Sequence, residues 1–462
     1  MHTQTSNPSE DGTAVSDGQR LQQLKDAGVD TLVIGAADIN GVFRSKRFAL
    51  DLFSREEVEV AFSDYVFASD LTDELMVPRP GYEGYFPTAA SGLPDIYVHP
   101  DWDLLRILPW EPEVALVLGD FHGHDGSELV VSPRGVLRRV IDRLRGLGFE
   151  PMAGAEYEFF VFKCPPEEAA ADPSKLIPLS IGPAYSHTRA AADERVLGVL
   201  RRMINAAGIP VEAANPEAAQ GQSEITIRYS DALSAADNAF LYRHFIQELA
   251  AREGLTASFI AKIDPQGYGS SGHLHVSLTD LEGEQQMLGD DGELTDTARQ
   301  AIAGFLETMG PFTSFYAPVI NSYRRYQTDY AFAGDTIAWG YDNRTCGLRV
   351  IKATPGSTRI ESRTPGADLN PYIALAATLA GFGHGIEAGL EPPAPIPADA
   401  YTASGVGRVP NDLGSATRAL EDSSVAADWL GEEFVNFYVE TRFWETEQHR
   451  LAVTDWELRR YL

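Results

Sequence analysis

Acidic side chains at alternate positions give the first indication of chemistry in this sequence. In A-E-Y-E-F-F at residues 155–160, one aromatic residue separates Glu156 from Glu158. Side chains on a β-strand alternate between its two faces, so in a strand both carboxylates point the same way. Two carboxylates on one face repel each other unless a cation lies between them. The pair therefore indicates either a solvated acidic strand or a site for a metal cation.

The same alternation recurs three times further along the chain, in E-A-A-Q-G-Q-S-E, G-H-L-H-V-S-L and R-I-E-S-R. In strands, the side chains that share a face are Gln222 with Glu224, His273 with His275 and Ser277, and Arg359 with Glu361 and Arg363. Each segment alone is weak evidence. Together they predict that several strands line one charged cleft.

Composition narrows the class of partner. The 462 residues include 37 Lys+Arg against 67 Asp+Glu, and the net charge of −30 argues against general binding to nucleic acid or an anionic membrane. The two cysteines, Cys164 and Cys346, support neither a disulfide framework nor a cysteine metal site. The start of the chain lacks a signal-peptide pattern, and no apolar run reaches the ~20 residues of a membrane span. We expect a cytoplasmic protein whose partners are small molecules and metal cations.

The chain divides into three parts by pattern. Residues 1–18 are polar and predict a flexible tail. Residues 19–112 predict a small α/β unit, and Pro109 and Pro112 mark its end. Residues 113–462 predict the larger domain, in which helices alternate with strands that suit an antiparallel sheet, so the fold class is α+β. The expected helices are 21–27, 133–147 with Ser132 as its cap, 193–207 and 235–253, and the expected strands are 31–36, 42–48, 95–99, 114–119, 155–160 and 257–263.

A series of motifs then identifies a family. In order, the chain contains E-Y-E-F-F, E-x-x-x-G-Q-x-E, G-S-S-G-H-L-H-V-S-L, N-S-Y-R-R, W-G-Y-D-N-R-T, R-I-E-S-R, A-D-L-N-P-Y and V-T-D-W-E-L-R-R-Y. This series resembles the signature of the glutamine synthetase family over about residues 25–462. The resemblance implies a small β-grasp-like N-terminal domain and a large catalytic domain with a curved antiparallel sheet flanked by helices. It also implies ATP-dependent formation of a γ-glutamyl amide through γ-glutamyl phosphate.

The resemblance assigns roles to single residues. One Mg²⁺ or Mn²⁺ ion would be held by Glu158, Glu217 and Glu224, and a second by Glu156, His273 and Glu361, which gives at least two ions per site. Contacts to glutamate would come from Arg325, Arg363 and the backbone of Gly269, contacts to the nucleotide from Ser277, Arg349 and Arg359, and stabilisation of the phosphoryl group in flight from Arg344. His275 is interpreted as a structural histidine, and a cross-strand pair of Arg359 with Glu361 is the alternative to nucleotide binding.

Two departures from the family pattern concern the amine. In A-F-S-D-Y-V, the position of an ammonium-binding aspartate falls on Ser63, or on Asp64 if the register shifts by one, and a nearby serine is replaced by Val66. The flap position that normally carries a glutamate falls on Ala331 or Phe332. Loss of carboxylates weakens ammonium binding and leaves room. We therefore expect a primary amine as nucleophile, with a small monoamine such as ethanolamine slightly favoured over a polyamine.

An organic ammonium must lose a proton before it attacks, and Asp64, Asp329 and Asp335 are the candidate bases. Two alternatives stay open: a glutamine synthetase that uses ammonia, and a catalytically silent homologue with a structural or sensing role. The resemblance further implies a homo-dodecamer of two stacked rings with active sites between subunits. Tyr401 is a loose candidate for the family's regulatory tyrosine.

Overall fold

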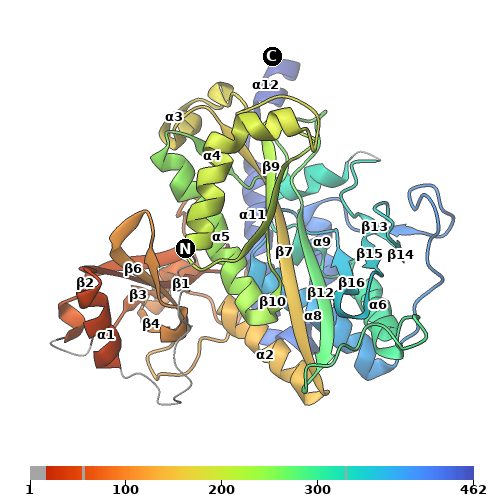
Figure 1. Cartoon of the computed structure of the whole chain (residues 1–462), viewed down its shortest axis with the longest axis horizontal. Helices are drawn as coiled ribbons and strands as arrows, with labels where there is room; N and C mark the ends of the chain where they lie inside the picture. The colour runs from red at the N-terminus through yellow and green to blue at the C-terminus, as the bar shows by residue number, and fades with distance from the viewer. Residues whose placement is uncertain (1–16, 55–57, 328–329) are drawn as a thin grey trace, which may run out of the picture.

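The computed structural model describes residues 17–54, 58–327 and 330–462, and these form two β-sheets with flanking helices (Figure 1). The smaller sheet has the strand order β2-β1-β6-β4-β3, with β5 paired to β6. Its strands are β1 Thr31–Ala37, β2 Phe43–Ala49, β3 Ala61–Ser63, β4 Asp95–Pro100, β5 Arg106–Leu108 and β6 Glu111–His122. Strands β1 and β6 run parallel, and the other pairs are antiparallel. The α+β class expected from the sequence is confirmed.

The larger sheet carries the charged segments. Its order is β14-β15-β16-β12-β7-β9-β8, with β10 and β11 also paired to β7, and only β14 and β15 run parallel. Its strands are β7 Phe149–Phe162, β8 Val211–Pro216, β9 Gln222–Ile227, β10 Ser230–Asp231, β11 Thr256–Ser258, β12 Gly272–Asp280, β14 Trp339–Tyr341, β15 Leu348–Ile351 and β16 Arg359–Ser362, while β13 Thr336–Ile337 and β17 Gly407–Arg408 form a separate ribbon.

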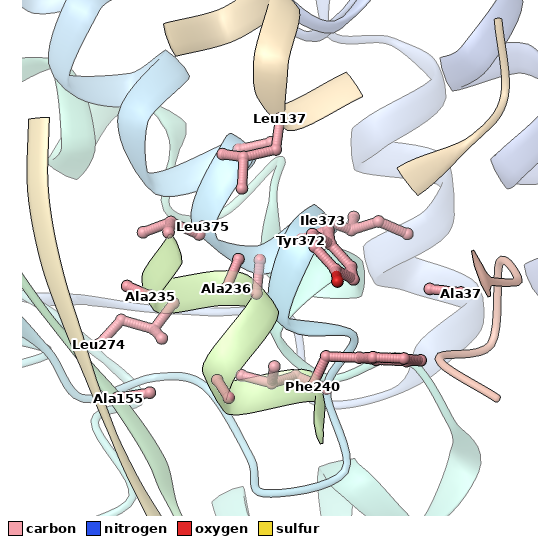
Figure 2. Close-up of a cluster of buried hydrophobic side chains, with 14 of the residues drawn as sticks. Ala37, Leu137, Ala155, Ala235, Ala236, Phe240, Leu274, Tyr372, Ile373 and Leu375 are labelled. Atoms are coloured by element: carbon pink, nitrogen blue, oxygen red, sulfur yellow. The ribbon is translucent and has the colours of Figure 1, made fainter. Parts of the chain in front are cut away.

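Helices pack behind this sheet and form the main core. Figure 2 shows side chains of α2, α5 and α8 gathered against β7 and β12, represented by Leu137, Phe240, Tyr372, Ala155 and Leu274. The helices are α1 Asp17–Asp26, α2 Pro133–Gly146, α3 Pro166–Ala171, α4 His187–Ala206, α5 Ala232–Arg252, α6 Asp296–Thr308, α7 Thr313–Tyr316, α8 Pro371–Ala388, α9 Leu413–Glu421, α10 Ser424–Leu430, α11 Glu432–Leu451 and α12 Asp455–Tyr461. Within the described ranges, no helix combines the length and apolarity needed to cross a membrane.

A helix cap ties the small sheet to the larger domain. Asn370 stands at the N-cap of α8, where its side chain accepts a hydrogen bond from the backbone of Tyr372 (3.1 Å). Its amide nitrogen also donates to the carbonyl of Asp38, in the turn between β1 and β2 (3.0 Å). One side chain therefore caps a helix of the large domain and holds a turn of the small sheet.

Three expectations about local structure need correction. The strand expected at 114–119 as the start of the larger domain is part of β6, which pairs with β1 and β4, so a boundary at 112/113 would cut the small sheet. The strand expected at 257–263 ends at Ser258. Ser132 occupies the N-cap position of α2 but makes no capping hydrogen bond. Most of the expected tail at 1–18, and Asp329, lie outside the described residues.

Candidate active site

Neighbouring strands bring the four charged segments onto one face of the larger sheet. In the pairing of β7 with β9, Glu158 lies opposite Glu224. In the pairing of β12 with β7 and β16, His273 lies opposite Glu156 and His275 opposite Glu361. The aromatic residues between the glutamates of β7, such as Tyr157, are buried on the other face. The alternation that the sequence shows thus becomes a single charged surface.

Glu158, Glu217 and Glu224 form an acidic group on this surface. Glu158 accepts hydrogen bonds from the side chain of Gln222 (3.1 Å) and the backbone of Ser271 (2.8 Å). Burial and the charge of Glu217 raise the pKa of Glu158 to about 8. Burial together with the neighbouring glutamates raises the pKa of Glu224 to about 9, and burial also raises that of Glu217. Such a set of oxygen ligands fits a hard divalent cation, which would remove the repulsion.

Glu156, His273 and Glu361 form a second group beside the first. The His273 Nδ1 atom lies 3.8 Å from a Glu156 oxygen and 3.6 Å from a Glu361 oxygen. Burial and the charge of Arg363 lower the pKa of His273 to about 4, so its imidazole is neutral at physiological pH and has a lone pair for a metal. His273 Nε2 is buried without a hydrogen-bond partner among the described residues. Two carboxylates and one imidazole suit Mg²⁺ or Mn²⁺.

His275, interpreted from the sequence as structural, belongs to the same group. Its Nε2 atom lies 3.3 Å from Glu156, and its Nδ1 accepts a hydrogen bond from Arg359 (3.2 Å). Ligand atoms of Glu156, His275 and Glu361 all lie within 4.8 Å of one another. The alternation in H-L-H was the signal for His275, because it places both histidines on one face.

Arginines balance the second group. Glu361 accepts hydrogen bonds from Arg363 and from Arg349 (2.9 Å). Burial opposes the charge of Glu361, but Arg363, the two histidines and Arg349 outweigh burial and lower the pKa of Glu361 to about 2. Arg359 hydrogen-bonds to His275 and to the carbonyl of Ser357 (3.1 Å), so the cross-strand pair with Glu361 does not form.

A cavity of about 270 Å³ adjoins the second group. Glu156, His275, Ser277 and Arg359 line it, together with backbone from Met152 to Ala155 and the segment 356–358. Its polar end holds the basic and imidazole side chains that suit phosphate oxygens. The cavity thus contains two of the three residues expected to contact the nucleotide, and Arg349 lies beside it through its bond to Glu361.

The two arginines expected to bind glutamate donate hydrogen bonds to backbone carbonyl groups. Buried Arg325 donates to Thr364 (3.0 Å), to the hydroxyl of Ser271 (2.9 Å) and to Ala333 (3.4 Å). Arg363 donates to the carbonyl of Phe332 (3.5 Å). Both arginines therefore reach the segment that follows residue 329, which we call the flap (residues 330–335).

Gly269 lies against Arg325. A Cβ atom there would approach the Cγ atom of Arg325 and the carbonyl oxygen of Ala261 to 2.6 Å, closer than real Cβ contacts. The backbone carbonyl of Gly269 accepts a hydrogen bond from Gln222 (2.9 Å). Only glycine fits this close approach, as expected for backbone that lines a substrate site.

Arg344 and Tyr185 stand at the edge of the acidic group. Arg344 is exposed and donates no side-chain hydrogen bond within the described part of the chain, and its charge helps to lower the pKa of the nearby Asp342. The charge of Glu217, with burial second, raises the pKa of Tyr185, and Arg344 opposes that shift, which places all three side chains near one another. Tyr185 was missed from the sequence because no spacing or charge pattern surrounds it.

The candidate bases differ in their surroundings. Asp64 is buried with one carboxylate oxygen that has no hydrogen-bond partner among the described residues, and burial raises its pKa to about 6. Ser63 instead donates to the carbonyl of Leu93 (3.0 Å). Asp335 is buried and forms an ion pair with Arg408. The charge of Arg408 stabilises the Asp335 carboxylate, which makes Asp335 a weaker proton acceptor than an unpaired acid.

A single chain does not assemble the whole expected site. Asp64 begins a short 3₁₀ helix, Asp64–Phe67, that follows β3, and Figure 1 shows β3 in the small sheet well away from β7. Glu158 and Asp64 thus belong to different regions of the molecule. The metal-type residues come together within one chain, whereas the residue expected on the amine side does not join them.

Comparison with known proteins agrees with these features. Residues 130–461 match the family model described as glutamine synthetase, catalytic domain. The chain is 36% identical over 442 residues to a glutamate–isopropylamine ligase from Pseudomonas sp, covering 94% of this chain and 95% of that protein. It is 38% identical over 448 residues to the gamma-glutamylethanolamide synthetase of Streptomyces coelicolor, covering 96% and 95%.

A solved structure shares the fold across the whole chain. The structure "Apo GmaS without ligand" superposes with a TM-score of 0.82 at 26% identity, covering 97% of this chain and 99% of that one. The family model matches the part of the chain that carries the charged surface. The two relatives align with 94% and 96% of the chain, and so with the small sheet as well. The chain therefore belongs to the glutamine synthetase family of ATP-dependent glutamate–amine ligases.

Proposed function

We propose that this chain joins the γ-carboxylate of glutamate to an organic primary amine, with a small monoamine preferred over a polyamine. The observation that carries this proposal is the flap. The position where the family carries an acid falls on Ala331 or Phe332, and the acid nearest in sequence within the described flap, Asp335, is paired with Arg408. A flap whose described acid is already paired with an arginine attracts ammonium weakly and suits an amine with apolar substituents.

The relatives support the same class of nucleophile. By their names, one acts on isopropylamine and the other makes the amide of ethanolamine. Both amines are small and carry a single ammonium group, but one substituent is branched and apolar and the other ends in a hydroxyl. The relatives therefore favour a monoamine over a polyamine and leave the substituent to be determined.

The acidic group would hold one Mg²⁺ or Mn²⁺ ion through Glu158, Glu217 and Glu224. The second group, which we call the mixed group, would hold another ion through Glu156, His273 and Glu361. The raised pKa values of Glu158 and Glu224 support this assignment, because a cation relieves repulsion that the chain itself leaves in place. Divalent ions bound there would neutralise charge on the phosphoryl oxygens. His275, at 3.3 Å from Glu156, would either complete the second set or contact a phosphate.

The arginines would position the reactants. Arg359 and Ser277 face the cavity that suits the nucleotide, and Arg349 would reach its phosphates from β15. Arg325 and Arg363 would bind the carboxylates of glutamate, since a planar guanidinium matches a carboxylate with two parallel hydrogen bonds. Arg344, exposed and donating no side-chain hydrogen bond within the described chain, would stabilise the phosphoryl group during transfer.

The reaction then has two steps. An oxygen of the glutamate γ-carboxylate attacks the γ-phosphorus of ATP and ADP leaves. The amine nitrogen attacks the acyl carbon of γ-glutamyl phosphate, inorganic phosphate leaves, and the proton lost from the nitrogen passes to a base. With a pKa of about 6, Asp64 has a proton affinity suited to that role near neutral pH.

For Asp64 to act, it must come from the partner subunit, because it lies apart from Glu158 within one chain. We therefore propose a homo-oligomer, a dodecamer by the family resemblance, with sites shared between subunits. Asp64→Ala and Glu158→Ala chains, each inactive alone, should recover part of the activity when assembled together. A verified mixed oligomer without recovery would contradict shared sites.

The function is tested by phosphate release from ATP with glutamate and Mg²⁺ across ammonium, ethanolamine, isopropylamine, putrescine and spermidine, with products identified by mass. We expect turnover with a small monoamine and little with ammonium. Turnover with ammonium alone would make this chain a glutamine synthetase, and ATP-dependent stabilisation without phosphate release would indicate a silent homologue.

A further inference from the structure

Three aromatic rings meet at the flap. Tyr330 and Tyr401 have ring centroids 5.0 Å apart, and Phe332 packs edge-on to Tyr401 at 6.4 Å. We call these three residues the aromatic cluster. Phe332 is 38% exposed and Tyr330 49% exposed, so much of the ring surface faces outward instead of into a core. Exposed aromatic side chains that gather in one place commonly mark a binding surface.

The cluster lies directly beside the residues expected to bind glutamate. The backbone carbonyl of Phe332 accepts a hydrogen bond from Arg363, and that of Ala333 accepts one from Arg325. A Cβ atom on Gly334 would collide with the backbone of Arg363 at 2.3 Å, so the flap backbone lies against this strand. The rings therefore stand next to the place where the γ-carboxylate would be activated.

The backbone of the flap is strained at two of these residues. Tyr330 has a φ of 60° and Phe332 a φ of 52°, both in the left-handed region that bulky residues rarely occupy. Such a conformation is unfavourable for a residue with a side chain, and glycine would adopt it without strain. The chain adopts it at two aromatic residues two positions apart. The hydrogen bond from the Tyr330 hydroxyl to Asp399 (2.8 Å) fixes one ring further.

The cluster already accepts a cation. The guanidinium of Arg408 lies over the ring of Tyr401 at 4.8 Å and also forms an ion pair with Asp335. The ring face of an aromatic residue attracts ammonium groups, and its carbon surface packs against alkyl groups. The chemistry of the cluster therefore matches both parts of an alkylammonium ion.

We propose that Phe332, with Tyr330 and Tyr401, forms the wall that selects an alkyl-substituted ammonium over ammonium itself. The inference rests on the proposed function and adds the residues that determine the choice of amine. Ammonium is small and strongly hydrated and gains little from apolar rings, whereas isopropylammonium can bury its methyl groups against them. A polyamine would need further carboxylates. Among the described residues, the acids at this cluster are already engaged: Asp335 pairs with Arg408, and Asp399 accepts a hydrogen bond from Tyr330.

The test uses three variants of the full chain that change one side chain at the same strained position. Phe332→Leu keeps an apolar side chain but removes the ring, Phe332→Tyr keeps the ring, and Phe332→Glu introduces a carboxylate. Steady-state kinetics would give KM for isopropylamine, ethanolamine, glutamate and ATP, and thermal unfolding would show that each variant is folded.

We expect Phe332→Leu to raise KM for isopropylamine by about tenfold while KM for glutamate stays within about twofold. Phe332→Tyr, which keeps the ring, should raise KM for isopropylamine less than Phe332→Leu does, and Phe332→Glu should shift the preference toward ammonium. An equal rise in KM for glutamate and the amine would show that the cluster only holds the flap, and unchanged KM values would also overturn the inference. Turnover of the unmodified chain with ammonium alone would instead refute the proposed function.

Discussion

The two groups of charged residues on the larger sheet differ in how they are balanced. In the acidic group, burial and like charges raise the pKa values of Glu158 and Glu224, and no arginine donates a hydrogen bond to either within the described residues. In the mixed group, Arg349 and Arg363 bond to Glu361, and the two histidines lie against Glu156. The chain itself thus leaves the charge of the acidic group unbalanced, whereas it largely neutralises the mixed group.

The largest expected effect tests the acidic group. Glu224→Gln should lower ATP-dependent turnover by about a thousandfold, because the substitution removes a ligand and a charge from a metal site worth several kcal/mol to phosphoryl transfer. In EDTA the same variant should be at least as stable as the unmodified chain, since a neutral amide replaces a carboxyl whose ionised form is disfavoured by burial and by neighbouring glutamates. Phosphate release and thermal unfolding with and without Mg²⁺ measure both. A clear loss of stability in EDTA would contradict the comparison.

The mixed group should respond in the opposite way. Glu361→Gln leaves Arg363 without the carboxylate that it pairs with in a buried position, and breaking such a pair costs about 3–5 kcal/mol. We therefore expect a marked fall in the free energy of unfolding in EDTA, measured by denaturant titration. Glu224→Gln is the matched control, because it makes the same chemical change one group away. Equal stability of the two variants would show that both groups depend on the cation alike.

Asp64 sharpens the comparison because burial alone raises its pKa, to about 6. If Asp64 is the base, kcat/KM for the amine should fall as the pH drops through about 6, and Asp64→Asn should be slower by about a hundredfold and lose that limb of the profile. The pKa of Asp64 rises from 3.8 in the unfolded chain to about 6 in the folded one, so between these pH values the folded chain binds the proton more tightly. The free energy of unfolding should therefore decrease as the pH rises from about 4 to about 6. Unfolding measured from pH 4 to 7 checks that sign, and a profile unchanged in Asp64→Asn would exclude the role.

Local patterns predicted much of the fold and of the charged surface. Strand alternation placed Glu156, Glu158 and Glu361 on one face because the period of two is a property of the backbone. The assignment of 114–119 to the larger domain failed because an apolar run shows that a strand is buried but not which sheet it joins. That choice depends on the contacts of β6 with β1 and β4, far away in sequence.

Long-range pairing also explains what the sequence left open at the site. The sequence around Asp335 does not predict its ion pair with Arg408, which lies 73 residues further along the chain. Tyr185 lies in a loop beside the acidic group, and loop residues show no hydrophobic periodicity that would predict their position. His275 and His273 share the same alternating pattern and differ in their neighbours. The hydrogen bond from Arg359 to the His275 Nδ1 atom joins residues 84 positions apart, so no local pattern predicts it.

The alternation in β7 also limits how this sequence can change in length. Glu156 and Glu158 serve different groups, yet both depend on one register against β9 and β12. Insertion of a single residue within β7 ahead of Glu156 would turn both carboxylates toward the helices and bring Tyr157 and Phe159 to the open face. Both groups would be lost in one event. Substitutions can therefore accumulate along this strand, whereas insertions and deletions of odd length should be absent from every active descendant.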